Sequence, residues 1–393
     1  MGKQDSEKAL NAIPLYTPDV FPTSHMLSLF GSSSVPSFNT SSSDPPTLWR
    51  APADIADPGR ESTLPSESLV ARIVVGCTRK LHSLGFALPA MVKSFRLLQN
   101  IGINVTPNHF YYPVPDLSQL EKREWPLYSF PPRSRFDLGK QVKLARDLSS
   151  KYREEWNFTS DPKQHNYHYN NGYFEAVDAE IAYSLVRQFK PGLVLEIGTG
   201  HTTRVLATAL QQNMERDQTE GKLVSIDPNP DRFLRNGWEG TVIQIPKSIQ
   251  DMDLSLINQL ESGDILFIDS SHVIAVGSDV VCEYLEILPR LRPGVIVQFH
   301  DIFLPSDYPR DAVLKRLCFW SEQYLLHAFL SFNNDFEVLW ASSAMCLRHS
   351  DVLEQCFPRW AHSYIQMPRS KRRFVPTMDQ DHVWPSSFWI RRV

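Results

Sequence analysis

The sequence LVLEIGTGHTT at residues 193–203 decides the fold class. Its apolar run leads to Gly198 and Gly200, and a helical pattern begins within two residues of the second glycine. A buried strand, a tight turn and a helix N-terminus are the units of a doubly wound α/β sheet, and ligands bind where its strands end. The stretch therefore predicts a site for a small ligand at this turn.

The residues around the two glycines discriminate between kinds of ligand. A dinucleotide site requires a third glycine in G-x-G-x-x-G, and this chain has Thr203 at that position. Glu196 precedes the first glycine, where a carboxylate would repel a pyrophosphate and attract an ammonium group. The pattern therefore favours a zwitterionic ligand over an anionic one, and an ordinary strand-to-helix turn without a ligand is the alternative.

The composition is that of a globular, enzyme-sized chain. The 393 residues are 42% hydrophobic and 11% aromatic, which suffices for a sizeable core in one or two domains. The net charge of −4 argues against nucleic acid as the main partner. No apolar run reaches the roughly 18 residues that stable membrane insertion needs, and the polar N-terminus predicts no secretory signal. Five cysteines without a C-x-x-C pair indicate a reducing compartment, so we expect a cytoplasmic protein, with a homo-oligomer left open.

Three regions are expected along the chain. Residues 1–60 are predicted to be a disordered tail, because their Ser/Pro-rich part has no apolar period. Residues 61–164 are expected to form a helical N-terminal cap region, with an amphipathic helix at 138–156. Residues 165–393 are predicted to form a Rossmann-like domain with an insert at about 345–384. Its His-, Asn- and Tyr-rich beginning, at 165–173, is expected to be a ligand-binding loop.

Strands and helices alternate after the glycine turn. Strands are predicted at 222–227, 241–246, 263–269, 293–303, 336–342 and at the C-terminus, and helices at 202–217, 278–290 and 311–329. Together with the first strand, this alternation specifies a doubly wound, seven-stranded α/β sheet.

Polar residues follow several of these strands. Asp227 ends the second strand, where a carboxylate can accept hydrogen bonds from both ribose hydroxyls of a nucleoside. Ser248 and Ile249 follow the third strand and are placed to border an adenine. Asp269 and Asp301 end the fourth and fifth strands, so both are expected at the same edge of the sheet.

The motifs E-x-G-x-G, FIDSSH at 267–272 and FHD at 299–301 occur in one register with Asp227. They resemble the class I S-adenosylmethionine (SAM) methyltransferases, and residues 94–340 are most similar to the branch with cephalosporin-hydroxylase-like and macrolide-sugar O-methyltransferases. The resemblance implies SAM as cofactor and a small-molecule acceptor, such as a natural product of secondary metabolism. It implies cofactor contacts from Glu196, Gly198, Thr199, Gly200, Thr202, Thr203, Asp227, Ser248, Ile249 and Asp269, with Glu196 reaching the methionine ammonium directly or through water.

The same resemblance implies the acceptor chemistry. In the macrolide-sugar enzymes, an acid after the fourth strand and an acidic pair after the fifth bind Mg²⁺, and a histidine acts as base. Asp269 and Asp301 match the metal positions, His272 matches the base, and His300 replaces the usual glutamate. Since imidazole suits softer metals, the expected metal set Asp269, His300 and Asp301 would take Mg²⁺ or another divalent ion. A hydroxyl is a poor nucleophile, so His272 and Asp269 are the expected catalytic residues.

Other interpretations stay open from the sequence. A SAM-binding protein that transfers no methyl group, such as a regulator, a scaffold or a catalyst of another step, would keep the same turn. An NAD-dependent oxidoreductase is disfavoured by Thr203 and Glu196. His272 and His300 also have packing alternatives, as a helix cap and a core histidine.

Overall fold

A computed structural model describes residues 95–100, 102–104, 106, 112–125, 127–130, 135–159, 167–230, 242–366, 378–379 and 382–393. The chain divides into two units, residues 1–93 and 94–393, and every described residue belongs to the second. The predicted tail at 1–60, the cap region up to residue 94 and His165 therefore lie outside the described residues. Within the described part, no helix combines the length and apolarity that a membrane crossing requires.

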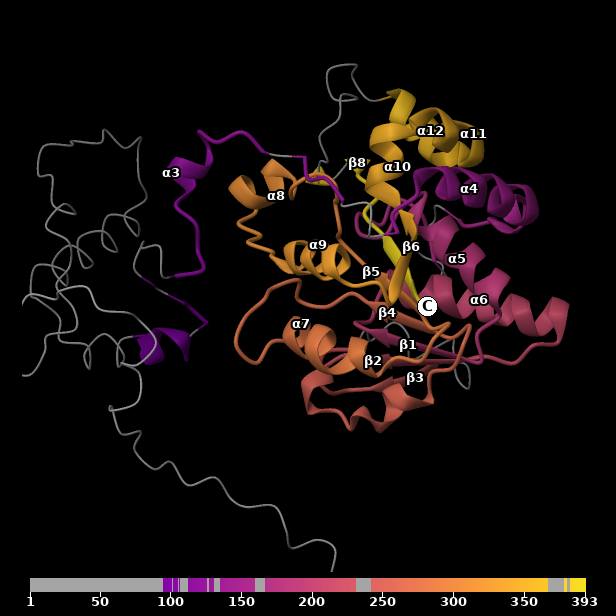
Figure 1. The fold of residues 1–393 in the computed structure, drawn as a ribbon, viewed down its shortest axis with the longest axis horizontal. Helices are drawn as coiled ribbons and strands as arrows, with labels where there is room; N and C mark the ends of the chain where they lie inside the picture. Colours follow the sequence, from indigo (N-terminus) through magenta and orange to yellow (C-terminus); the bar gives the residue numbers. More distant parts are fainter. Residues whose placement is uncertain are drawn as a thin grey trace, which may run out of the picture. The chain divides into compact units, whose positions relative to one another are not determined.

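The second unit is built on a seven-stranded sheet with the strand order β3-β2-β1-β4-β5-β9-β6 (Figure 1). The first five strands pair in parallel, and β9 runs antiparallel between β5 and β6. The strands are β1 (Leu193–Ile197), β2 (Lys222–Ile226), β3 (Val242–Ile245), β4 (Ile265–Ile268), β5 (Ile296–Phe299), β6 (Phe336–Ala341) and β9 (Phe388–Arg392). This confirms the predicted doubly wound α/β fold, including the C-terminal strand.

Two cores lie on the two faces of the sheet, because each face is covered by helices. Val194 of β1 packs in the core that includes residues of α5 and α6, whereas its neighbour Leu195 packs in the core that includes residues of α7 and α9. The first face carries α4 (Leu138–Tyr152), α5 (Asp178–Phe189), α6 (His201–Asp217), α11 (Ser350–Cys356) and α12 (Pro358–Gln366). The second carries α7 (Asp279–Cys282), the π-helical η7 (Glu283–Ile287), η8 (Leu288–Arg290) and α9 (Glu322–Phe332).

The remaining elements are short. They are α3 (Leu117–Leu120), η3 (Arg153–Glu155), η5 (Ile249–Asp251), η6 (Leu254–Gln259), α8 (Arg310–Lys315), α10 (Ser342–Arg348) and the hairpin of β7 (Met378–Asp379) and β8 (His382–Val383). The helix predicted at 138–156 is present as α4 followed by η3. The helices α11 and α12, with most of α10, fall in the stretch that the sequence singled out as an insert.

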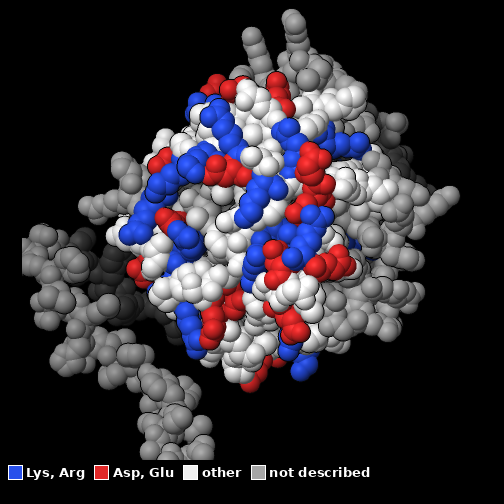
Figure 2. All heavy atoms as spheres, turned by 90° about the vertical axis from the view of Figure 1, so that its right-hand side faces the viewer, with Lys and Arg blue, Asp and Glu red and all other residues white. Residues whose placement is uncertain are grey.

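Buried charge joins the helices of the first face. The guanidinium of Arg187 in α5 lies 2.8 Å from Glu155 of η3 and 2.6 Å from Asp217 at the end of α6. The face of the molecule on the right-hand side of Figure 1 shows acidic and basic side chains intermixed (Figure 2). Arg187 therefore links the C-terminal ends of α5 and α6.

The single helix predicted at 311–329 is wrong. The structure has α8 and α9, with residues 316–321 between them. The backbone N–H groups of Ser321 and Glu322 donate to the carbonyl oxygen of His272, at 2.8 and 3.1 Å. Hydrogen bonds to a distant loop thus replace those that would continue the helix, and they bring the start of α9 to the end of β4.

Candidate active site

A cavity of about 190 Å³ lies at the carboxyl edge of β1, β2 and β4. This edge includes the switch point between β1 and β4, where ligands of doubly wound sheets bind. The cavity brings together predicted cofactor residues from four separate segments of the chain. Its lining consists of Ile197, Gly198, Ile226, Asp227, Pro228, Ser248, Ile249, Gln250, Asp269, Ser270 and Asp279.

Gly198 is required by the close approach of β1 and β4 at the turn. Its φ of 96° disfavours any residue with a side chain, and a Cβ there would lie 2.3 Å from the carbonyl oxygen of Asp269. Gly200 differs, because its φ of 174° is ordinary extended backbone. A Cβ on Gly200 would meet no atom within 4 Å, so the space beside this residue is open for a ligand.

Glu196 locks the turn to the first turn of α6. The carboxylate is fully buried and accepts hydrogen bonds from the hydroxyls of Thr202, at 2.6 Å, and Thr203, at 2.7 Å. Thr203 in turn accepts from the backbone N–H of Gly200. Burial raises the pKa of Glu196 to about 8, although the two hydroxyls oppose this shift. These contacts give Glu196 a positioning role at the turn, and its contact with a ligand ammonium stays a prediction.

The residues predicted to contact a nucleoside also line the cavity. Asp227 follows β2, half-buried, with one carboxylate oxygen 2.6 Å from the backbone nitrogen of Asn229. Ile249 is buried beside the half-buried Ser248, as a border for a flat apolar ring requires. Thr199 does not line the cavity; its hydroxyl lies 2.6 Å from that of Ser225 on β2.

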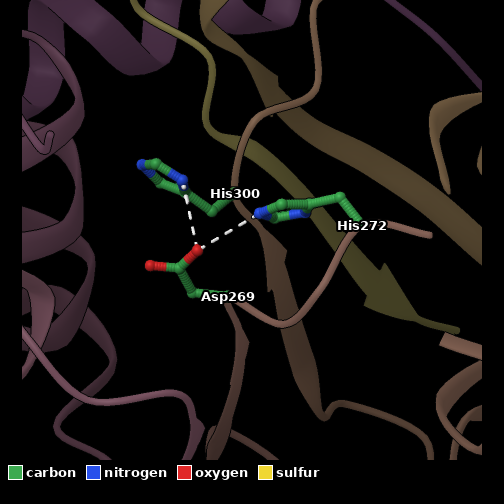
Figure 3. A group of neighbouring side chains, drawn as sticks. All are labelled: Asp269, His272 and His300. Atoms are coloured by element: carbon green, nitrogen blue, oxygen red, sulfur yellow. Dashed lines mark ion pairs between the residues drawn. The ribbon is translucent and has the colours of Figure 1, made fainter. Parts of the chain in front are cut away.

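Asp269, His272 and His300 meet where β4 and β5 end (Figure 3). One carboxylate oxygen of Asp269 lies 3.5 Å from Nε2 of His272 and 3.4 Å from Nδ1 of His300. Asp301 completes the group, at 3.5 Å from Nδ1 of His300 and 3.7 Å from Nε2 of His272. All four predicted acceptor-side residues are therefore neighbours, and Asp269 joins them to the cavity.

The acids and imidazoles of this cluster shift one another's pKa. Burial opposes the charge of Asp269 and Asp301, but the rings of His300 and His272 lower the pKa of both carboxyls. Burial also opposes the imidazolium forms, yet the surrounding carboxylates raise the pKa of His272 to about 10 and that of His300 well above its ordinary value. The surrounding carboxylates therefore favour the protonated form of both rings.

The cluster also fits a divalent metal. Both ring nitrogens of His300 are buried, and neither has a hydrogen-bond partner within the described part of the chain. Its 3.4 and 3.5 Å separations from Asp269 and Asp301 are long for hydrogen bonds. They match the spacing of about 3.4 Å between two ligands that each lie about 2.1 Å from one tetrahedral ion. A nitrogen donor in this set suits a transition metal better than Mg²⁺.

Several residues at this edge could not be found from the sequence. Ser386, which precedes β9, donates its hydroxyl to Asp301 at 3.1 Å. The backbone N–H of Ser386 donates in turn to the buried carboxylate of Asp178, at 2.7 Å, and burial raises the pKa of that carboxyl. Glu322 contacts His272 from the start of α9. The one available signal was Glu322 as the single charged residue of the stretch 318–326.

The loop expected to bind a ligand is only partly free to do so. Tyr167 and Tyr169 are buried, and their rings pack edge to face against each other and against Phe158. Tyr173 is 73% exposed, and its ring stacks on His201, directly after the glycine turn. Tyr173 is therefore the tyrosine of this loop that is placed to contact a ligand.

Comparison with known proteins bears on this site directly. Residues 195–302, which run from β1 past β5, match the family model of a methyltransferase domain. Residues 195–302 are therefore similar to a methyltransferase domain, the kind of domain that the sequence motifs resemble. A methyltransferase domain of this family implies SAM as its cofactor.

Individual relatives are distant. An uncharacterised protein of Archaeoglobus fulgidus is 27% identical over 173 residues, which are 42% of this chain and 76% of that protein. The SAH-bound structure of the methyltransferase PaMTH1 from Podospora anserina is 14% identical, with a TM-score of 0.31 over 60% of this chain and 93% of its own. The apo structure of CmcI-N160 is also 14% identical, with a TM-score of 0.30 over 58% and 90% of the two chains.

Proposed function

We propose that this chain transfers the methyl group of SAM to a hydroxyl group of a small-molecule acceptor, such as a natural product. The observation that carries the proposal is the double role of Asp269, which lines the cavity beside Gly198 and lies 3.5 Å from Nε2 of His272. The proposed base, His272, thereby lies near the cavity in which we propose that SAM binds. Such proximity is what an in-line transfer requires.

In this proposal, one set of residues binds the cofactor and another acts on the acceptor. SAM supplies a sulfonium methyl group, whose carbon–sulfur bond breaks with its electron pair on sulfur as the acceptor oxygen attacks the carbon. In this proposal Asp227, which lines the cavity, accepts hydrogen bonds from the ribose hydroxyls, and the ligand uses the open space beside Gly200. His272 takes the proton of the acceptor hydroxyl at Nε2, which leaves a methyl ether and S-adenosylhomocysteine.

The charge state of His272 fits this role once the site is filled. Its raised pKa of about 10 comes from carboxylates that include Asp269, Glu322 and Asp301. Positive charge bound beside these carboxylates offsets them and lowers the pKa, so the ring becomes able to accept a proton. Asp269, His300 and Asp301 would hold a divalent metal, which would lower the pKa of the acceptor hydroxyl and orient it.

Transfer of a tritiated methyl group from SAM to a panel of phenols, glycosides and hydroxy acids tests the proposal. We expect label in at least one hydroxyl compound, with an equal amount of S-adenosylhomocysteine formed. Calorimetric binding of SAM without transfer to any acceptor would instead favour a SAM-binding regulator, scaffold or catalyst of another step.

Asp227→Asn is expected to weaken SAM binding by about 10- to 150-fold, because a charged hydrogen-bond acceptor contributes roughly 1.5–3 kcal/mol. Isothermal calorimetry measures the effect. The matched control is Asp253→Asn, since Asp253 is an exposed cap of η6 outside the cavity. Equal SAM affinity in the Asp227 variant and the wild type would contradict the ribose assignment.

Removal of divalent metal is expected to slow methyl transfer by about 100-fold or more, since a metal stabilises developing charge by several kcal/mol. The measurement compares protein treated with EDTA, protein treated with calcium-saturated EDTA, and treated protein to which Mn²⁺ is restored. Suppose that the EDTA-treated protein contains no metal by elemental analysis and transfers methyl at an unchanged rate. This result would contradict a metal site at Asp269, His300 and Asp301, but it would leave the assignment of His272 as base.

A further inference from the structure

Three consecutive residues, Trp320 to Glu322, hold His272 from one side, and we call them the 320–322 clamp. The N–H groups of Ser321 and Glu322 donate to the carbonyl oxygen of His272, at 2.8 and 3.1 Å. The Ser321 hydroxyl accepts from the N–H of Ile274, at 2.8 Å, and the Trp320 ring packs edge to face on the His272 ring at 5.1 Å. The clamp thus contacts the backbone, the ring and the following loop.

His272 needs this support because its backbone is in a disfavoured conformation. Its φ of 60° lies in the left-handed region, which residues with side chains occupy only when their surroundings impose it. The two hydrogen bonds to its carbonyl oxygen come from the break between α8 and α9. That break therefore determines where the His272 ring points.

The Glu322 carboxylate fixes the ring itself. One oxygen lies 2.9 Å from Nδ1 of His272, and the other lies 3.4 Å from the Tyr284 hydroxyl. Glu322 is fully buried as the first residue of the 11-residue helix α9, whose N-terminus favours a negative charge. Because a carboxylate only accepts hydrogen bonds, Nδ1 of His272 must carry the hydrogen.

The opposite nitrogen faces the acceptor side. Nε2 of His272 points toward Asp269 and Asp301, at 3.5 and 3.7 Å, and both distances are too long for strong hydrogen bonds. With Nδ1 bonded to Glu322, Nε2 is the nitrogen that faces the carboxyl ends of β4 and β5. The ring is oriented for exchange with a group at the carboxyl edge of β4 and β5.

We propose that Glu322 is a positioning residue that holds Nδ1 of His272 by a hydrogen bond, so that Nε2 faces the methyl acceptor. This role rests on the proposed function. As the acceptor oxygen bonds to the methyl carbon, its proton passes to Nε2, and the imidazolium that forms is stabilised by the carboxylate at Nδ1. Glu322 does not touch the acceptor; it acts through His272.

Kinetics of Glu322→Gln test the role, because an amide can donate to Nδ1 and thereby hold the wrong tautomer. With an acceptor identified by label transfer, we expect kcat to fall about 100-fold or more, with the SAM dissociation constant and the acceptor KM within about threefold of wild type. The matched control is Glu180→Gln. Glu180 is an equally buried carboxylate, but it binds Tyr169 and the backbone of Val177 in α5, not His272.

A spectroscopic measurement tests the same role without any acceptor. In protein labelled with ¹⁵N-histidine, a buried Nδ1–H bonded to a carboxylate gives a downfield, slowly exchanging signal, which His272→Gln removes. We expect this signal to move upfield and exchange faster in Glu322→Gln, and to stay unchanged in Glu180→Gln. An unchanged signal in Glu322→Gln, or a kcat within threefold of wild type, would overturn the proposal. Absence of transfer in the wild type itself would overturn methyl transfer while the signal still decides the Glu322–His272 contact.

Discussion

His272→Gln is expected to lower kcat for methyl transfer by about 10²- to 10⁴-fold, the usual contribution of a general base. Glutamine keeps a polar side chain at this buried position but cannot take a proton from a hydroxyl. SAM affinity should change little, because His272 does not line the cavity. Initial rates with a labelled methyl group and calorimetry with SAM measure the two effects separately.

The control for this variant is His327→Gln on α9. His327 packs its ring on Phe130 and lies 3.2 Å from the carbonyl oxygen of Ser129, outside the catalytic cluster. We expect a rate close to that of the wild type. A His272 variant that keeps its rate within threefold would contradict the assignment of the base.

Gly198→Ala is expected to lower the free energy of unfolding by about 2–6 kcal/mol, from overpacking and a disfavoured φ together. The added Cβ would lie 2.3 Å from the carbonyl oxygen of Asp269, and backbone atoms cannot move aside as a flexible side chain does. Since the clash is with the residue that joins the two halves of the site, SAM binding should be lost as well. Denaturant unfolding and calorimetry measure these effects.

Gly200→Ala tests ligand binding at the glycine turn separately from the turn's contribution to stability. Its Cβ meets nothing within 4 Å, so the melting temperature of the ligand-free chain should not change. If SAM lies against this backbone, its affinity should fall by about tenfold, as expected for overpacking of about 1.4 kcal/mol. Equal SAM affinity in this variant would place the ligand elsewhere in the cavity.

The fold was predictable because its signals are local. Buried parallel strands form mostly apolar runs, and those at 193–197, 222–226 and 265–268 each end in a polar or glycine turn. Parallel strands bring their carboxyl ends to one edge, so Asp227, Asp269 and Asp301 could be placed together before any coordinates. The strand pairing confirms that common edge.

The contacts that orient the site were not predictable, because they join distant segments. Glu322 lies 50 residues from His272, and Ser386 lies 85 residues from Asp301. The apolar spacing at 311–329 fits one continuous helix, so only the tertiary hydrogen bonds to His272 reveal the break before α9. Glu196 shows a similar limit, since its buried hydrogen bonds to Thr202 and Thr203 depend on how the turn folds.

The roles proposed for His272 and its neighbours at the ends of β4 and β5 depend on SAM occupying the cavity beside Gly198. Calorimetric titration of the full chain with SAM, and separately with NAD, tests this most directly. We predict saturable binding of one SAM per chain and no heat of binding with NAD. Saturable binding of NAD without binding of SAM would contradict the account.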